Sequence, residues 1–435
     1  MVRTRLRLGA SITAMGLVAI FLATLTPAPD QARLVAKLPT WCLVCGDLGG
    51  VDVTLNVLLF IPFGIGLTLA GVRWRRVILI AAVTSGCIEL LQYSAIVGRD
   101  ASLSDFLTNT LGGALGALIA NTARTWLTPR SAPARRLAAA AALVWIAQAV
   151  VTAYALTPSL PRSVYWGQHA PDLEQFERFR GQVVSADIGP AEIPEGRLRN
   201  SARVRALLLD SATFQAIAVP AGPTPGLAPV ASIFDGDKNE IALLGQDGVD
   251  LVFRLRTHAV DLRLRPPALR VASAFAAGPA DTVRMSGVLV GNRLVARVSA
   301  GSATREAARA LSPQWGWSLL LPFHHAFGAD TAWVTALWIA AWLAVLGYWT
   351  RQGWTAPASA ALVLLATAVA GLVVVPWVFG FEPAPFTQWL GAVCGAAIGW
   401  GAGAWMARSG RRLLRAIDRA DYAIDPPSAR SAASP

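Results

Sequence analysis

Long apolar runs separated by short arginine-bearing links dominate both ends of the chain. They lie at about residues 8–25, 52–70, 77–97, 105–121, 137–156, 331–348, 356–378 and 386–406. Each comes close to the roughly 20 residues that a helix needs to cross a bilayer. Between the fifth and sixth runs, short segments alternate apolar and polar residues, as half-buried strands do. The pattern predicts a polytopic α-helical membrane protein with about eight transmembrane helices and an inserted all-β domain.

Four regions follow from this pattern. Residues 1–158 are predicted to form a five-helix transmembrane domain, and residues 161–311 an extracytoplasmic β-sandwich or jelly roll. Residues 330–408 are predicted to form a three-helix transmembrane domain, and residues 418–435 a disordered cytoplasmic tail. The tail is polar and contains no apolar run that would fold against a core.

Within the β region, the alternation predicts strands and the glycines predict turns. Strands are expected at residues 204–209, 214–219, 241–244, 250–256 and 293–298. Hairpin turns are expected at Gly248 and Gly291, which stand in Asp-Gly and Gly-Asn pairs. Residues 174–180 resemble a short amphipathic helix.

Composition supports a membrane protein, since 54% of the 435 residues are hydrophobic and only 15% are charged. The formal net charge of +12 is carried by arginines that lie beside apolar runs, where positive residues act as topology signals. This arrangement argues against a nucleic-acid partner. It also predicts that every arginine-rich link lies on the cytoplasmic side. Both termini are then cytoplasmic, and the β-domain is extracytoplasmic.

The first apolar run and the cysteines each leave two interpretations open. Residues 8–25 fit a signal peptide or an uncleaved first helix, and the length of the run favours the helix. Cys42 and Cys45 lie in an outer loop and form either a structural disulfide or an incidental pair. Cys87 and Cys394 lie in apolar runs and are expected to be small fillers. None of the four histidines falls in the first helices, which argues against a histidine-based zinc site there.

Polar residues interrupt the second, third and fourth apolar runs. An ionisable group inside a bilayer is costly unless it is paired or faces water, so such groups mark a candidate functional site. The topology places all of them near the outer ends of the helices, with Glu89 about 12 Å deep at 1.5 Å per residue. We therefore expect one binding pocket in the outer half of the membrane, in which Arg99 pairs with Glu89. The candidate residues are Asp52, Asn56, Glu89, Gln92, Arg99, Asp105 and Asn109.

A structural interpretation remains open for the residues near the interface, because charges there are cheap. Arg99 and Asp105 also fit a pair that fixes topology, whereas the depth of Glu89 favours a role in the site. Gly112 and Gly116 form a small-xxx-small pattern that lets two helices approach closely. Pro62 predicts a kink in the second helix.

Three blocks together resemble the VanZ-like family, which is named for a teicoplanin-resistance protein. They are Asn56-Val-Leu-Leu-Phe-Ile-Pro-Phe-Gly64, Glu89-Leu-Leu-Gln92, and the stretch from Arg99 through Asp105 and Asn109 to Gly116. The resemblance covers roughly residues 10–125 and implies a bacterial envelope membrane protein. It marks Asn56, Glu89, Gln92, Arg99, Asp105 and Asn109 as motif positions. Asp52 stands where the family often has a basic residue or histidine, which leaves the role of that position open.

Residues 165–305 are similar to concanavalin-like and laminin-G-like jelly rolls. Such folds often bind glycans, sometimes with calcium. Asp235, Asp237 and Asn239 have the spacing of calcium ligands, but the same spacing occurs in ordinary polar turns, which we favour. We expect no cofactor and no metal.

The favoured hypothesis is a bacterial membrane protein that binds a cell-envelope glycan or its lipid-linked precursor at the outer leaflet. Its expected partners are membrane lipids and an envelope polysaccharide or lipid-linked glycan. Three alternatives remain. Glu89 and Asp105 could serve as the acid and base of an enzyme that acts on a lipid-linked substrate. Glu89 could be the coupling carboxylate of a transporter. The β-domain could dock a protein partner during envelope assembly.

Overall fold

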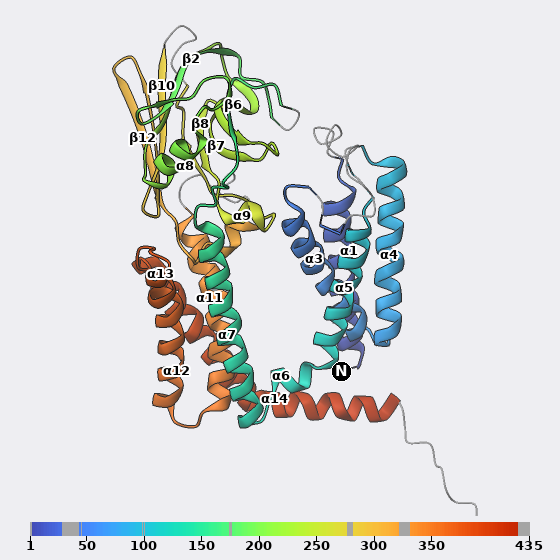
Figure 1. Ribbon diagram of the computed structural model, residues 1–435. Coiled ribbons are helices and arrows are strands. Elements are labelled where there is room, and N and C mark those ends of the chain that lie inside the picture. The colour runs from blue at the N-terminus through green and yellow to red at the C-terminus, as the bar shows by residue number, and fades with distance from the viewer. Residues whose placement is uncertain are drawn as a thin grey trace, which may run out of the picture. The chain divides into compact units, whose positions relative to one another are not determined.

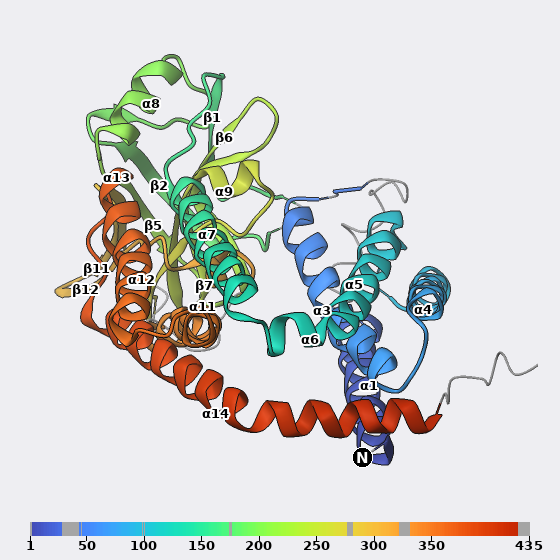
Figure 2. The same cartoon turned by 90° about the horizontal axis from the view of Figure 1, so that it is seen from below.

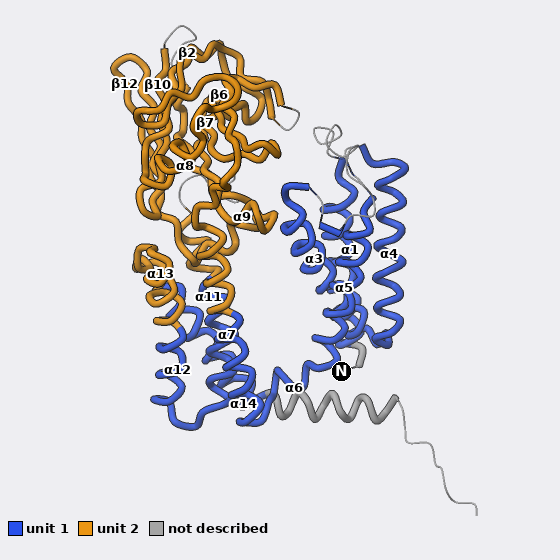
Figure 3. The backbone as a smooth tube through the Cα atoms, viewed as in Figure 1, with its two compact units in different colours: residues 1–144, 339–367, 390–435 blue, residues 145–338, 368–389 orange. Residues whose placement is uncertain are grey.

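The structure is a computed structural model. It describes residues 2–27, 43–44, 46–97, 99, 101–173, 176–275, 282–321 and 331–424. The chain divides into two compact units (Figure 3). Unit 1 comprises residues 1–144, 339–367 and 390–435, and unit 2 comprises residues 145–338 and 368–389. Cys42, Cys45, His324 and His325 lie outside the described residues.

Seven helices within the described ranges are long and apolar enough to cross a membrane. They are α1 (Val2–Leu25), α3 (Gly49–Leu69), α4 (Trp74–Ala95), α7 (Ser131–Leu156), α11 (Ala332–Gly353), the continuous segment Pro357–Val378 and the first part of α14 (Phe386–Ile424). The eighth expected span is also helical, as α5 (Leu103–Asn121), but its polar residues make it less apolar than the other seven. The prediction of a polytopic helical protein with an inserted β-domain is therefore confirmed.

The first four long helices pack side by side in unit 1 (Figures 1 and 2). Their shared core contains Ile20, Phe60, Phe63, Ala81 and Ile88, all at most 2% exposed. α3 and α5 make the closest approach, because glycines face backbone on both sides. A Cβ built on Gly112 would lie 2.3 Å from the Val57 carbonyl oxygen, and one on Gly116 would lie 2.2 Å from that of Ile61. The predicted small-xxx-small packing is thus present, with α3 as the partner helix.

Glycines also let α14 pack closely against α11 in unit 1. Cβ atoms built on Gly395 and Gly399 of α14 would lie 2.2 and 1.9 Å from the carbonyl oxygens of Ala340 and Ala344 on α11. A short helix that the sequence pattern does not predict, α6 (Ala123–Leu127), precedes α7. The α6 carbonyl of Trp126 accepts a 2.8 Å hydrogen bond from the indole of Trp349.

Unit 2 is built on two antiparallel six-stranded sheets that face each other. One has the order β4-β1-β6-β7-β8-β9, and the other β12-β11-β10-β5-β2-β3. The strands are β1 (Tyr165–His169), β2 (Gly181–Ile188), β3 (Ala191–Glu192), β4 (Gly196–Arg197), β5 (Phe214–Pro220), β6 (Thr224–Asp235), β7 (Glu240–Gly248), β8 (Asp250–Leu255), β9 (Ala268–Val271), β10 (Val283–Val290), β11 (Arg293–Ala300) and β12 (Ala303–Ala310). Their inward side chains share one core, and Gly287 makes room there for the ring of Phe253.

Most of the strands and turns expected in the β region are present, but one expected strand is wrong. The turns at Gly248 and Gly291 are present, with φ of 64° and 60°, and strands occupy four of the five expected segments. The exception is residues 204–209, which belong to helix α8 (Ser201–Leu209). Asn200 caps this helix by accepting a 2.9 Å hydrogen bond from the Arg203 amide. Val204 and Leu208 are four residues apart and bury one face of α8. The apolar residues here therefore follow the period of a helix and not the alternation of a strand.

Two further expectations differ from the described backbone. Residues 176–180 contain no helix, although residues 174–180 were expected to form one. α14 remains helical to Ile424, beyond residue 418, where the disordered tail was predicted to begin. The cause lies in its sequence, since no Pro or Gly follows Gly410 before that point.

The sandwich is anchored on helix ends that belong to the same unit. Where α12 (Pro357–Val369) passes into α13 (Val375–Val378), the backbone adopts one π-helical turn at residues 370–374. The carbonyl oxygen of Gly371 in this turn accepts a 2.9 Å hydrogen bond from buried Gln314. A Cβ on Gly371 would lie 2.3 Å from the indole of Trp145, so only glycine fits here. The π-helical turn is thus hydrogen-bonded to the segment that follows β12.

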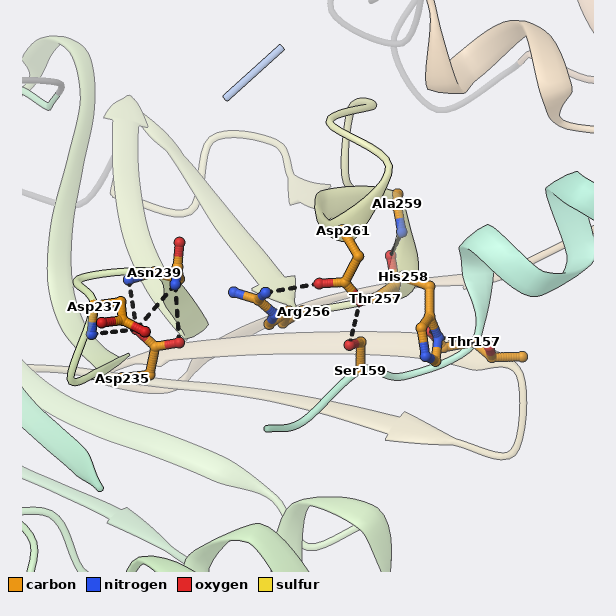
Figure 4. Close-up of polar contacts among 10 residues, drawn as sticks. All are labelled: Thr157, Ser159, Asp235, Asp237, Asn239, Arg256, Thr257, His258, Ala259 and Asp261. Carbon is orange, nitrogen blue, oxygen red and sulfur yellow. Dashed lines mark hydrogen bonds and ion pairs between the residues drawn. The ribbon is translucent and has the colours of Figure 1, made fainter. Parts of the chain in front are cut away.

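A second anchor lies where α7 enters the sandwich (Figure 4). The ring of His258, at the start of α9 (His258–Asp261), lies 3.1 Å from the Thr157 hydroxyl and packs on Tyr154 with ring centroids 4.3 Å apart. Asp261 accepts hydrogen bonds from Ser159 at 2.6 Å and from Arg256 at 2.8 Å. These contacts join the end of α7 to β8 and α9.

Candidate functional site

The polar residues of the first bundle lie at the N-terminal ends of α3 and α5 and the C-terminal half of α4. The Asn56 side chain on α3 donates a 2.8 Å hydrogen bond to Oδ1 of Asp105 on α5. Both side chains are partly buried. Since α3 and α5 approach closely at their glycines, two short polar side chains are long enough to meet between them. Asn56 and Asp105, which were expected to lie in one pocket, are therefore in direct contact.

Glu89 on α4 is tied to the start of α5. Its Oε2 accepts a 2.7 Å hydrogen bond from the backbone amide of Ser102. Ser102 is also the N-cap of α5, and its hydroxyl accepts from the Ser104 amide at 3.1 Å. A carboxylate that binds an amide beside a helix N-terminus is favoured by the partial positive charge of that terminus. Glu89 thus fixes the turn between α4 and α5.

Asn109 lies deeper in the same interface and is only 1% exposed. Its amide nitrogen donates a 3.0 Å hydrogen bond to the hydroxyl of Ser85, which is fully buried on α4. Ser85 precedes Glu89 by one helical turn, so both face α5. The Asn109 carbonyl oxygen is buried and has no hydrogen-bond partner among the described residues. A buried amide oxygen in that state is an unused acceptor.

Gln92 and Arg99 make their described contacts with the end of α1. Gln92 is 7% exposed and donates a 2.9 Å hydrogen bond to the Thr24 carbonyl. Arg99 donates through Nε to the Thr26 carbonyl at 3.1 Å and through a terminal nitrogen to the Ala23 carbonyl at 3.0 Å. The last carbonyls of a helix carry partial negative charge and no intrahelical partner, so they attract a guanidinium. Arg99 is held at the C-terminus of α1.

The candidate residues therefore form two groups that share α4. Asn56, Glu89, Asp105 and Asn109 link α3, α4 and α5, while Gln92 and Arg99 bind α1. The pairing of Glu89 with Arg99 was expected, but the contacts described for these two side chains lead to other groups. Asp52 lies exposed in the first turn of α3, one turn before Asn56.

Several participants were not among the candidates. They are serines and backbone groups, namely Ser85, Ser102 and the carbonyls of α1. One signal was available, because Ser85 stands four residues before Glu89 and shares its helical face. The α1 carbonyls carry no sequence signal, since any residue supplies one.

The suspected calcium ligands of the β region form a turn instead (Figure 4). Oδ1 of Asp235 accepts from the backbone amides of Asp237 at 3.0 Å and Asn239 at 2.8 Å. The Asn239 side chain donates to both carboxylate oxygens. This is the local bonding of an aspartate-stabilised turn, in which the carboxylate is already occupied. Among the described residues, no group of three or more His, Cys, Asp or Glu side chains is placed to hold a metal ion.

Fold and site together define a class, that of polytopic membrane proteins with a polar network inside their first helical bundle. A family model supports a narrower assignment. Residues 10–124 match the VanZ/LLP1 family, and this range includes all seven candidate residues. The N-terminal helices therefore form a VanZ-like domain, which ends before α7 and the sandwich. Comparisons with curated protein sequences and with solved structures gave no match.

Proposed function

We propose that the VanZ-like domain binds the anionic head group of a lipid-linked cell-envelope glycan precursor at the outer leaflet. The observation that carries the proposal is the position of Arg99. Its two described hydrogen bonds use two of the five N–H donors of a guanidinium. The planar guanidinium fork suits phosphate oxygens, and holding it at a helix end reduces the entropy lost on binding. Arg99 would thus contact the phosphate.

The carboxylates would position that arginine. The hydrogen bond from Ser102 to Glu89 fixes the turn that follows α4, and Arg99 lies in the same turn. The hydrogen bond between Asn56 and Asp105 fixes α3 against α5. Both carboxylates accept hydrogen bonds that join helices or fix a turn, which is the role of groups that organise a site. Binding is therefore the function we favour over catalysis.

The orientation is part of the proposal. Arg73 lies between α3 and α4, and Arg75 and Arg76 lie in the first turn of α4, at the opposite end of this helix from Arg99. Positive residues accumulate in cytoplasmic links, so the end that carries Arg99 would face outward. If successive helices cross the membrane in turn, α7 ends on the same side as Arg99. The β-sandwich that follows α7 would then be extracytoplasmic. Its ligand would then be the glycan part of the same precursor or of the mature polymer.

Native mass spectrometry of the gently solubilised protein tests the proposal. We expect the wild type to retain a polyprenyl phosphate or glycolipid, and Arg99→Ala to lose it. Glu89→Ala should also lose it, because Ser102 then has no acceptor there. Arg297→Ala is the matched control, because it removes an arginine that pairs with Glu306 at 2.5 Å on the surface of the β-sandwich. Retention of the lipid by Arg99→Ala at the wild-type level would contradict the proposal.

A further inference from the structure

The β-sandwich contains a small pocket beside the two-residue edge strand β4. Its volume is about 260 Å³, just below the range of about 300–1,000 Å³ in which drug-sized ligands bind. The walls come from β1, from the segment that follows β1, and from β4. The lining residues are Trp166, Gly167, Gln168, His169, Pro171, Asp172, Leu173, Glu195 and Gly196.

Trp166 gives the pocket an exposed aromatic surface. It lies on β1, opposite Arg197 of β4 and Phe234 of β6, and 41% of it is exposed. Its two neighbours on the strand, Tyr165 and Gly167, face the core and are buried. A large apolar side chain that stays exposed in a pocket wall is available to stack on a ligand.

Three polar side chains in the walls can accept hydrogen bonds. Nε2 of His169 lies 2.9 Å from the Ile193 carbonyl oxygen, which can only accept, so Nε2 carries the proton. Nδ1 of the neutral ring is then an acceptor. Asp172 and Glu195 add two carboxylates, while no lysine or arginine lines the pocket. Arg178 lies 3.9 Å from Asp172, but both side chains are more than 70% exposed, so this ion pair leaves the carboxylate accessible.

The backbone around the pocket is unusual at both walls. Ala170, directly after β1, has φ of 42°, a left-handed conformation that is uncommon for residues other than glycine. Its amide bonds the Val230 carbonyl at 2.9 Å, which holds it there. On the other wall, a Cβ on Gly167 would lie 2.3 Å from the Pro194 carbonyl oxygen, so the chain before β4 lies directly against β1. Strained backbone of this kind is often found at binding sites.

We infer that this pocket binds one ring of a hexopyranose without an anionic group, within an envelope glycan. An indole stacks on the C–H face of a pyranose, and the sugar hydroxyls donate to Asp172, Glu195 and Nδ1 of His169. The carboxylates of Asp172 and Glu195 in the lining repel anions, which disfavours uronic acids and phosphorylated sugars. The inference rests on the proposed function for its choice of an envelope glycan. It adds a sugar site in the sandwich that is separate from the phosphate site at Arg99.

Isothermal titration calorimetry of the full chain with soluble oligosaccharides tests the inference. The protein is kept in a detergent without a sugar head group, because a glucoside or maltoside would compete. The probes are a glucose oligomer, an N-acetylglucosamine oligomer, a uronic acid oligomer and choline. We expect at least one neutral oligomer to bind and the uronic acid oligomer not to bind. Binding of choline alone, or of no neutral oligomer, would overturn the inference.

Variants locate the binding. Trp166→Ala should lower the affinity for the neutral oligomer at least about tenfold, whereas Trp166→Phe, which keeps an aromatic ring, should lower this affinity less. Glu195→Gln should also weaken it. Asp210→Asn is the matched control, because Asp210 is an exposed carboxylate after α8, outside the pocket lining. Equal affinity in Trp166→Ala and wild type would overturn the pocket assignment, with thermal unfolding confirming that both are folded.

The two proposals fail separately. Arg99→Ala should leave the binding of soluble oligosaccharides unchanged, because these probes carry no lipid phosphate. Loss of the lipid phosphate in Arg99→Ala together with no oligosaccharide binding in wild type would contradict the sugar pocket alone. Oligosaccharide binding by wild type with no retained lipid would contradict the phosphate site alone.

Discussion

Replacing Gly112 by alanine should separate α3 from α5 and destabilise the VanZ-like domain. The added methyl carbon would lie 2.3 Å from the Val57 carbonyl oxygen and 2.9 Å from Cβ of Phe60. The first contact is with backbone, so a change of side-chain rotamer cannot relieve it. The two helices must move apart by about 1 Å to restore an ordinary contact of about 3.5 Å.

The magnitude combines two effects of opposite sign. Alanine is favoured over glycine in a helix interior by about 0.5–1 kcal/mol. Overpacking of a tight contact costs about 1–3 kcal/mol. The separation would also stretch the 2.8 Å hydrogen bond between Asn56 and Asp105, and such a bond in a membrane protein contributes about 0.6 kcal/mol. We expect a net loss of about 0.6–3 kcal/mol.

Reversible unfolding in a mixed detergent and denaturant series measures this loss. Gly401→Ala is the matched control, since Gly401 lies in α14 and a Cβ built there would meet nothing within 4 Å. That variant should be unchanged or slightly more stable, because only the helix preference acts. If Gly112→Ala is as stable as Gly401→Ala, the close packing of α3 on α5 does not hold the domain together.

Three other predictions follow from the described contacts. A double-mutant cycle of Asn56→Ala and Asp105→Ala, followed by unfolding, should give a coupling energy of about 0.6–2 kcal/mol. Gly371→Ala should lower the unfolding midpoint of the sandwich, because its methyl carbon would lie 2.3 Å from the Trp145 ring. Burial raises the pKa of Tyr165 from its ordinary value of 10.0 to about 12. The unfolded chain therefore loses this proton first, and stability should fall between about pH 10 and 12 in wild type, but less in Tyr165→Phe.

Each of these has an outcome that counts against it. A coupling energy of zero would mean that Asn56 and Asp105 do not interact in the folded protein. Unchanged stability of Gly371→Ala would contradict the claim that only glycine fits against the Trp145 ring. For Tyr165, a wild type and a Tyr165→Phe variant with the same alkaline stability profile would show that the phenol is not buried.

The sequence predicts the helices and strands well because their periodicities are local. Apolar runs of about 20 residues define the membrane helices, and the glycine turns define the hairpins at Gly248 and Gly291. The error at α8 arose because its six-residue window fits either period. The Asn200 cap before it was the signal that favours a helix.

The site was predictable in its residues more than in its contacts. The four-residue spacings and the topology bring Asn56 and Asp105 to one interface, where the structure joins them. The described partners of Glu89 and Arg99 were not predictable, because they are a backbone amide and backbone carbonyls that any sequence supplies. The pocket beside β4 also left no signal, since Trp166 and Glu195 come together only through strand pairing.

Arg99 is proposed to make the VanZ-like domain a phosphate-binding site for an isoprenoid lipid. The most direct measurement compares the affinity of the purified protein for a short-chain isoprenoid phosphate with its affinity for the corresponding alcohol. We predict that wild type binds the phosphate at least about tenfold more tightly, as one charge-assisted contact allows, and that Arg99→Ala removes this preference. Equal affinity of wild type for phosphate and alcohol, or the same preference in Arg99→Ala, would contradict the account.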